Sequence, residues 1–250
     1  MTYDIIKKII NEVLEMGKGK KKRKAKRKLE AYRRRDVKRK MGKPVFLNLC
    51  KTPKSLKGLS DRYIYKANLY RVLYTNGHFY NVRWNASNIT RCSFKNTHCK
   101  GVDFVNSNLK KTSFKGAILE NVMFFNCNLK DVDFENAQFK SVYFVSTNIK
   151  NAKNLNLDAN CKIYSSYPKL DVGSTVKNAL FQIYKTSSES KCNVLLVNES
   201  KLNLWIVKIL YDNYGEDIYR ALLAFCRKKY KQKFFTLFSY EKHIVNYLKL

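Results

Sequence analysis

The side chains with the clearest chemical potential in this sequence of 250 residues are its cations. Fifty Lys and Arg stand against nineteen Asp and Glu, so the formal net charge is +31. An excess of this size indicates an anionic partner, which is either nucleic acid or an anionic membrane surface. The cations are densest in residues 18–43, which we call the basic arm, where sixteen Lys and Arg accompany only Glu30 and Asp36.

The basic arm has a net charge of +14, sixteen cations less two acids. Few helix breakers follow Gly19, and the run ends at Gly42 and Pro44, which predicts a basic helix. Its cations repel one another in water, whereas bound phosphates remove that repulsion and counterion release favours binding. The arm residues expected to contact nucleic acid are Lys20, Lys21, Lys22, Arg23, Lys24, Lys26, Arg27, Lys28, Arg33, Arg34, Arg35, Lys38, Arg39 and Lys40.

Other interpretations fit the same composition. A solubilising tail and a nuclear-targeting signal have equally dense cations. Binding to a membrane surface is less favoured, because an interfacial helix needs an apolar face and the arm has few large apolar residues. The preceding segment does place aliphatic residues at helical spacing, which predicts a short amphipathic helix that contains Ile5, Ile6, Ile9, Ile10, Val13 and Leu14.

Residues suited to catalysis or metal binding are scarce. Besides His243, the histidines are His78 and His98, twenty residues apart, and with Cys99 they would supply too few ligands for a metal site. No GxGxxG, P-loop, HExxH or GxSxG motif occurs. We therefore expect no enzymatic activity, no cofactor and no bound metal.

The seven cysteines include no CxxC pair, and an odd number indicates reduced thiols rather than a disulfide framework. Charges interrupt the N-terminal residues every few positions, unlike a secretory signal. No run of eighteen apolar residues predicts a transmembrane helix. These features predict a protein of the cytoplasm or nucleus.

A period of five residues organises the middle of the chain. An apolar residue recurs at every fifth position, and a small or β-branched residue precedes each by two positions. Neither an α-helix nor a simple strand has this period, since their side chains repeat every 3.6 and 2 residues. The recurring apolar residues are Leu69, Tyr74, Phe79, Trp84, Ile89, Phe94, Cys99, Phe104, Leu109, Phe114, Leu119, Phe124, Leu129, Phe134, Phe139, Phe144 and Ile149.

The segments ANLYR (67–71), SNLKK (107–111) and CNLKD (127–131) resemble the units of the pentapeptide-repeat family. The resemblance covers about Ile64 to Ile149 and implies a right-handed, four-sided β-helix with four pentads in each coil. Residues twenty apart should then stack, and the sequence agrees, because aromatic and aliphatic residues separate into different ladders. The turns between sides are expected at Asn96, Asn106, Gly116, Asn126 and Asn136, types that tolerate unusual backbone angles.

The side with aliphatic centres should present two ladders to solvent. Asn68, Asn88, Asn108, Asn128 and Asn148 form one, which we interpret as structural, because stacked Asn side chains satisfy one another. The other is a stripe of cations on a flat β face, which is either a phosphate-binding surface or a solvated edge. Its members are Arg71, Arg91, Lys110, Lys111, Lys130 and Lys150.

A neighbouring side is apolar on its outer surface as well. Contiguous exposed apolar residues mark a contact surface. The expected occupant is the protein's own C-terminal region, and a second subunit is the next choice. The residues of this apolar stripe are Val105, Met123, Phe125, Tyr143 and Val145.

Changes in these patterns predict three domains. Residues 1–58 comprise the amphipathic helix, the basic arm and a cap, residues 59–155 the β-helix, and residues 156–250 a helical domain. The predicted helices of the last domain are Val176–Tyr184, Leu202–Tyr211, Ile218–Tyr230 and Phe234–Leu248. This domain also contains cations interleaved with aromatic residues, a pattern that suits contacts with nucleic acid. The alternative is the Lys-rich outer face of a helical bundle. The cations concerned are Arg227, Lys228 and Lys229.

The predicted fold is thus mainly β, a β-helix flanked by a basic helix and a helical domain. The predicted function is a non-enzymatic scaffold that binds nucleic acid or a nucleoprotein particle through the basic arm and basic faces. A protein–protein interaction scaffold is the alternative. The resemblance also implies a third role, since some family members mimic DNA and protect topoisomerases, but those proteins are acidic where this chain is basic.

Overall fold

The computed structural model describes Glu30 and residues 47–186, 192–227 and 233–250. The chain divides into two compact units, Met1–Val45 and Phe46–Leu250. The predicted amphipathic helix and basic arm belong to the first unit and lie, except for Glu30, outside the described residues. The β-helix and the helical domain both belong to the second.

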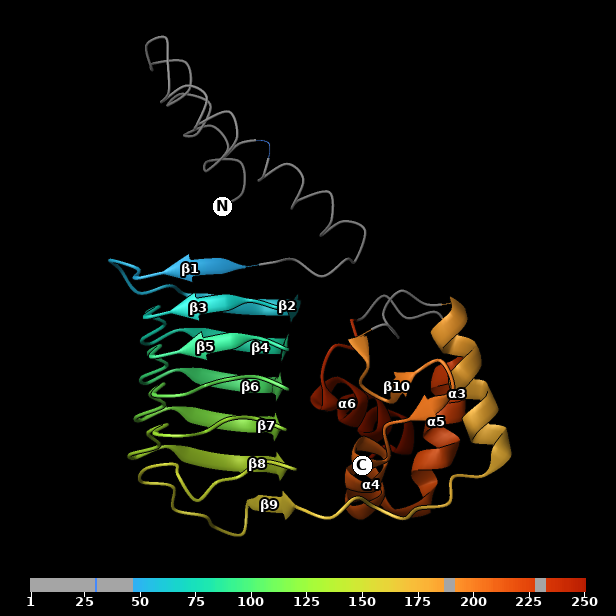
Figure 1. Cartoon of the computed structure of the whole chain (residues 1–250). Coiled ribbons are helices and arrows are strands. Elements are labelled where there is room, and N and C mark those ends of the chain that lie inside the picture. The colour runs from blue at the N-terminus through green and yellow to red at the C-terminus, as the bar shows by residue number, and fades with distance from the viewer. Residues whose placement is uncertain (1–29, 31–46, 187–191, 228–232) are drawn as a thin grey trace. The chain divides into compact units, whose positions relative to one another are not determined.

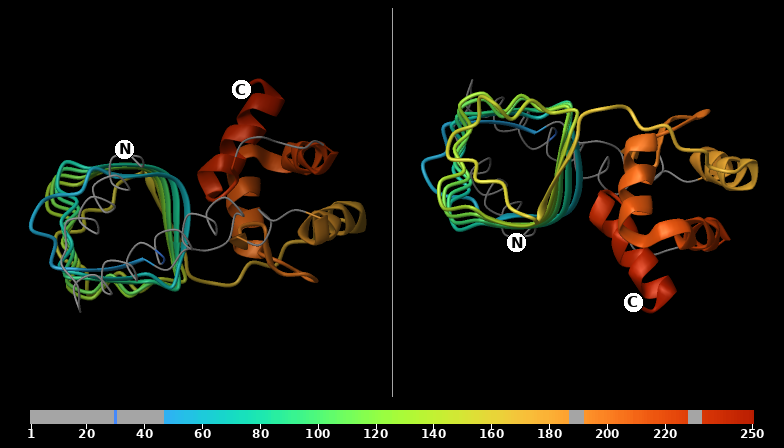
Figure 2. Two further views of the ribbon diagram at one scale, coloured as in Figure 1. Left: turned by 90° about the horizontal axis from the view of Figure 1, so that it is seen from above. Right: turned by 90° about the horizontal axis from the view of Figure 1, so that it is seen from below.

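Parallel strands stack at intervals of twenty residues, as the five-residue period predicts (Figure 1). The longer sheet pairs β2 (Gly58–Tyr65), β4 (His78–Asn85), β6 (His98–Val105), β7 (Ile118–Phe125), β8 (Gln138–Val145) and β9 (Cys161–Tyr164). The shorter sheet pairs β1 (Asn48–Cys50), β3 (Asn68–Tyr70) and β5 (Asn88–Thr90). Seen along the stack, the successive coils superpose in a four-sided outline (Figure 2).

The corners of this outline recur every five residues. Each fifth residue from Asp61 to Ser146 has a positive φ, between 46° and 64°. Asn tolerates this left-handed conformation best after Gly, which explains the Asn-rich turns. The predicted turn residues Asn96, Asn106, Gly116, Asn126 and Asn136 are all corners, so this prediction is confirmed.

The interior of the coils is a set of stacked side chains. Phe104, Phe124 and Phe144 lie face to face, with neighbouring ring centroids 5.3 Å apart, and each is fully buried. The aliphatic ladder is equally buried from Leu69 to Leu129. The segregation of aromatic and aliphatic ladders seen in the sequence is therefore the packing of the core.

At several pentads the small residue is Ser or Thr, and its hydroxyl accepts a hydrogen bond from the backbone of the preceding coil. Ser107 Oγ accepts a hydrogen bond from Ser87 N at 3.1 Å, and Thr112 Oγ1 accepts one from Cys92 N at 3.3 Å. A larger side chain at these buried positions would fill the space that the stacked rings occupy. The position therefore favours Ser, Thr, Cys, Ala and Val.

The β-helix extends beyond the predicted range 59–155 at both ends. Residue Leu49 of β1 is already in register with Leu69, twenty residues later, so the predicted cap contains part of a coil. At the other end β9 pairs with β8, although Val142 now faces Cys161, nineteen residues later. The five-residue pattern misses both segments because their apolar residues no longer fall at strict intervals.

The helical domain contains α3 (Ser174–Thr186), α4 (Leu204–Tyr214), α5 (Ile218–Arg227) and α6 (Leu237–Leu248), close to the four predicted helices. A 3₁₀ turn, η2 (Gly215–Asp217), leads into α5, where the acidic start was predicted. The sequence did not predict the hairpin of β10 (Leu196–Asn198) and β11 (Lys201–Leu202), because such short strands carry no period. None of the helices that the structure describes is long and apolar enough to cross a membrane.

The helical domain covers the predicted apolar stripe. Val105, Met123, Tyr143 and Val145 are at most 4% exposed and share one apolar cluster with residues of α3 to α6. Phe125 is partly buried, and its ring lies 6.3 Å from that of Trp205 in α4. The stripe does face outward, but it is not an exposed interface for another chain, because the protein's own C-terminal region occupies it.

Candidate functional site

The predicted cations of the β-helix lie along one corner rather than on a flat β face. Arg71, Arg91 and Lys111 are corner residues of successive coils, with φ of 53°, 53° and 61°. All three are exposed. Lys110 and Lys130 each precede a corner position of the same column, and Lys150 follows Lys130 by twenty residues. The column of corner cations ends where Asp131 takes the next corner position, 3.8 Å from Lys153.

Within the described chain, none of these six cations forms an ion pair with a carboxylate. Arg71 lies over the Tyr70 ring, 5.3 Å from its centroid. Of the other predicted cations, Arg227 is exposed at the end of α5, whereas Lys228 and Lys229 lie outside the described residues, as does the basic arm. Among the described residues, no carboxylate neutralises the six cations of this column.

The Asn ladder supports this corner, as predicted. Asn108 donates to Asn88, and Asn128 donates to Asn108, both at 3.0 Å. The oxygens of Asn108, Asn128 and Asn148 also accept the backbone N–H two residues ahead, at Lys110, Lys130 and Lys150. The amides are therefore occupied, and they fix the backbone that carries the lysines.

A buried ion pair between two strands of the β-helix is hydrogen-bonded to the helical domain, and it was not predicted from the sequence. Arg83 Nη1 lies 2.6 Å from Asp103 Oδ2, and both side chains are at most 1% exposed. Arg83 also donates to Asn193 O at 2.9 Å, and Asp103 accepts from Leu237 N, the first residue of α6, at 3.0 Å. The sequence does contain a sign of this ion pair. Arg83 and Asp103 are opposite charges twenty residues apart, on the side of the β-helix whose outer residues are otherwise apolar.

Burial raises the pKa of Asp103 to about 6, while Arg83 and the Leu237 N–H act in the opposite direction. The carboxylate is nevertheless well placed, since the N-terminus of a helix favours a negative charge. Asn81, one coil before Gly101, accepts from Thr236 Oγ1 at 2.9 Å and donates to Lys233 O at 2.8 Å. These contacts hold the start of α6 on the β-helix.

Gly101 makes room for this contact. It is a corner with φ of 64°, a position that Asn81 and Asn121 occupy in the neighbouring coils. A Cβ atom on Gly101 would lie 2.3 Å from the Phe238 ring of α6. The absent side chain thus admits Phe238, whose ring centroid lies 5.9 Å from that of Tyr80.

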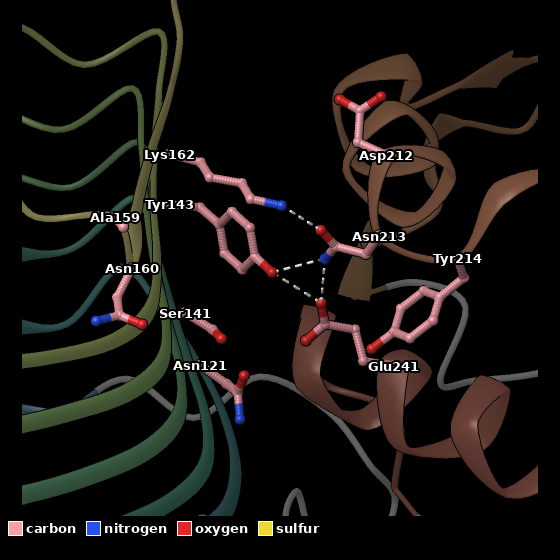
Figure 3. A pocket seen from close by; sticks show the side chains of 10 residues that line it. All are labelled: Asn121, Ser141, Tyr143, Ala159, Asn160, Lys162, Asp212, Asn213, Tyr214 and Glu241. Carbon is pink, nitrogen blue, oxygen red and sulfur yellow. Dashed lines mark hydrogen bonds between the residues drawn. The ribbon is translucent and has the colours of Figure 1, made fainter. Parts of the chain in front are cut away.

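A polar cavity of about 350 Å³ opens beside this contact (Figure 3). Tyr143 and Asn213 both donate to Glu241 Oε1 at 3.1 Å, and Asn213 also donates to Tyr143 at 2.7 Å. Lys162 completes the chain by donating to Asn213 at 2.7 Å. Glu241 accepts from both Tyr143 and Asn213 and is the terminal acceptor of this network.

Burial raises the pKa of Glu241 to about 7, although its hydrogen bonds from Tyr143 and Asn213 lower it. The side chain is 5% exposed, so desolvation of the charged form dominates. The Glu241 carboxyl can therefore bind or release a proton near neutral pH. Burial also raises the pKa of Tyr143, so that hydroxyl remains a donor.

Replacing Glu241 by Gln should remove a pH dependence of stability. The folded pKa of about 7 exceeds the ordinary value of 4.5, so the folded state retains a proton that the unfolded state releases. Stability from this group should fall by about 3 kcal/mol as pH rises from 4.5 to 7. Urea unfolding at pH 5 and pH 8 should show a smaller decline in Glu241→Gln than in the wild type. An equal decline in both proteins would contradict the assignment.

His78 and His98 lie one coil apart, as the register predicts. The rings of His78 and His98 meet edge to face, with centroids 6.3 Å apart, and His98 Nε2 lies 3.4 Å from Glu120. Cys99 points into the core and is fully buried. Among the residues described, no three His, Cys, Asp or Glu side chains are grouped to hold a metal ion.

Comparisons with known proteins concern the β-helix. The family model described as pentapeptide repeat region matches residues 67–154. No curated protein matches the chain. Similar solved structures include QnrB1, a plasmid-mediated fluoroquinolone resistance protein, which is 13% identical with a TM-score of 0.31 and aligns over 42% of this chain and 55% of its own. The chain thus spans about half the length of QnrB1.

Two further structures have comparable similarity. A pentapeptide repeat protein of the Arabidopsis thaliana thylakoid lumen is 17% identical, with a TM-score of 0.28, and covers 39% of this chain and 70% of its own. HetL from Nostoc sp. strain PCC 7120 is a protein involved in heterocyst differentiation regulation. It is 15% identical, with a TM-score of 0.26, and the alignment covers 52% of this chain and 89% of HetL. The period of five, the corner at every fifth residue and the family match agree, so residues 67–154 form a β-helix of pentapeptide repeats.

Proposed function

We propose that this protein is a non-enzymatic scaffold of the cytoplasm or nucleus that binds nucleic acid, free or in a nucleoprotein particle, through its cations. The observation that carries the proposal is the net charge of +31, of which the basic arm supplies +14. Lys and Arg that neutralise phosphates release condensed counterions, and this release drives binding. The corner cations would add contacts along a strand.

The corner cations suit this role because their positions are fixed. Arg71, Arg91 and Lys111 repeat once per coil on a rigid backbone, and they have no carboxylate partner among the described residues. Phosphates recur at regular intervals along a nucleic acid, so a column of cations can contact several of them. Contacts of this kind bind without reading the base sequence.

An interaction scaffold that uses the apolar stripe is less favoured. Val105 and Val145, which would have formed its contact surface, are at most 4% exposed beneath the helical domain. A protein partner would therefore need another surface, whereas the cations are open. The acidic DNA-mimic role is also disfavoured, because the chain has fifty Lys and Arg.

Salt dependence is the test of this proposal. Binding of fluorescent single-stranded DNA and RNA 20-mers to the full chain should weaken steeply between 50 and 300 mM salt. Six phosphate contacts correspond to a slope of log K against log salt of about −4, since each single-strand contact contributes about −0.7. Undetectable binding at 50 mM salt, or a slope shallower than about −1, would contradict the proposal.

A further inference from the structure

Three cations converge on a hollow of about 510 Å³ beside the start of α6. Arg62 comes from β2, Lys233 from the segment before α6, and Lys242 from α6 itself. All three are exposed. Three separated stretches of chain thus direct positive charge into one small space.

None of these three cations is neutralised within the described chain. Arg62 donates to the carbonyl of Asp61 at 2.9 Å, and Lys233 lies 6.0 Å from the centroid of the Phe235 ring. No ion pair among the described residues includes Arg62, Lys233 or Lys242. Among the described residues that line the hollow, Asp61 is the only carboxylate, so this lining carries a net positive charge.

Hydrogen bonds within the protein hold polar groups that line the hollow in fixed positions. Asn81 is buried and donates to Asp61 Oδ1 and to Lys233 O, both at 2.8 Å. The first bond occupies one oxygen of the Asp61 carboxylate, and the second holds the backbone carbonyl of Lys233. Tyr80 lines the same space and is only partly buried.

We infer that this hollow binds phosphate groups in the backbone of a single-stranded nucleic acid. The inference rests on the proposed function and places a phosphate site on the folded part of the chain. Clustered Lys and Arg recognise phosphate, and an aromatic ring beside them stacks on a base, which Tyr80 would provide. The hollow has the size of a typical small-ligand pocket, so it accommodates one or two nucleotides.

The test compares two triple variants of the full chain. The first is Arg62→Gln with Lys233→Gln and Lys242→Gln. The control removes the same charge from exposed lysines elsewhere, Lys54→Gln with Lys169→Gln and Lys201→Gln. Affinity for an oligouridine 12-mer should fall at least about tenfold more in the first variant, with a salt slope shallower by about 2, since three phosphate contacts are lost.

Two further readouts separate the possible outcomes. A 12-mer with 4-thiouridine should crosslink to the peptide that contains Tyr80, and inorganic pyrophosphate should compete weakly. Equal affinity losses in both triple variants would overturn this site but leave the proposed function intact. If the first triple variant loses pyrophosphate binding but keeps its affinity for oligouridine, the hollow binds phosphate but not a single-stranded nucleic acid, and the inference is overturned. If the wild-type chain binds no oligonucleotide, the proposed function and this site both fail.

Discussion

Deletion of residues 18–43 is expected to lower the affinity of the chain for nucleic acid by about 10³-fold or more at physiological salt. The deletion removes a net charge of +14 and leaves +17 of the original +31. Proteins with six to ten phosphate contacts lose about 10³–10⁵ in affinity between 50 and 200 mM salt, so such contacts dominate binding. Fluorescence anisotropy with DNA and RNA over a salt series measures the loss.

A matched control separates charge from chain length. A variant that keeps residues 18–43 but replaces every Lys and Arg there by Gln should behave like the deletion. The thermal melting temperature should be unchanged in both variants, because the β-helix starts at β1 (Asn48–Cys50), after the altered residues. Affinity within about threefold of the wild type in either variant would exclude the basic arm as the main source of binding energy.

Replacing Asp103 by Ala should destabilise the described unit by about 3–5 kcal/mol, the usual result of removing one partner from a buried ion pair. The change leaves the Arg83 guanidinium buried, at 1% exposure, without a counter-charge. It also removes the acceptor of the Leu237 N–H at the start of α6. Urea unfolding, followed by circular dichroism and tryptophan fluorescence, measures the change in free energy.

The double variant Arg83→Met with Asp103→Leu is the control for this prediction. Apolar replacement of a whole buried pair is often neutral or stabilising. Within the described residues, Arg83 Nε and Asp103 Oδ1 have no hydrogen-bond partner, so the pair is incompletely satisfied. The double variant should therefore be clearly more stable than Asp103→Ala. A single variant that loses less than about 1 kcal/mol would show that water reaches the pair.

The β-helix could be predicted from sequence because its determinants are local and repeated. Each pentad supplies one inward residue, one small residue and one corner, and a spacing of twenty then places Phe104 over Phe124. The Asn ladder followed from the same register. Where the interval changes, as between β8 and β9, the prediction ended too early.

The contact between β-helix and helical domain could be predicted only in part. Outward apolar residues indicated that something covers the side that carries Val105, and the C-terminal region was the expected occupant. The repeat pattern does not predict which groups of the two parts contact each other, because residues such as Asp103 and Leu237 are 134 positions apart in the sequence. Gly101 resembled any other corner, although its missing side chain admits Phe238.

The candidate binding surfaces, too, could be predicted only in part. Charge counting identified the basic arm and the corner column, because those cations are sequential or twenty residues apart. It did not find Arg62, Lys233 and Lys242, which meet only after α6 docks on the β-helix. It also did not find Glu241, whose pKa is raised by burial that the sequence does not reveal.

The most direct test of the proposed function is purification of the full chain from cells with and without nuclease. Without nuclease, the protein should elute with a high ratio of absorbance at 260 nm to that at 280 nm, and sequencing should identify bound DNA or RNA. Nuclease and high salt should remove that material. A preparation free of nucleic acid that retains one protein partner, unaffected by nuclease and salt, would contradict nucleic-acid binding and favour the interaction scaffold.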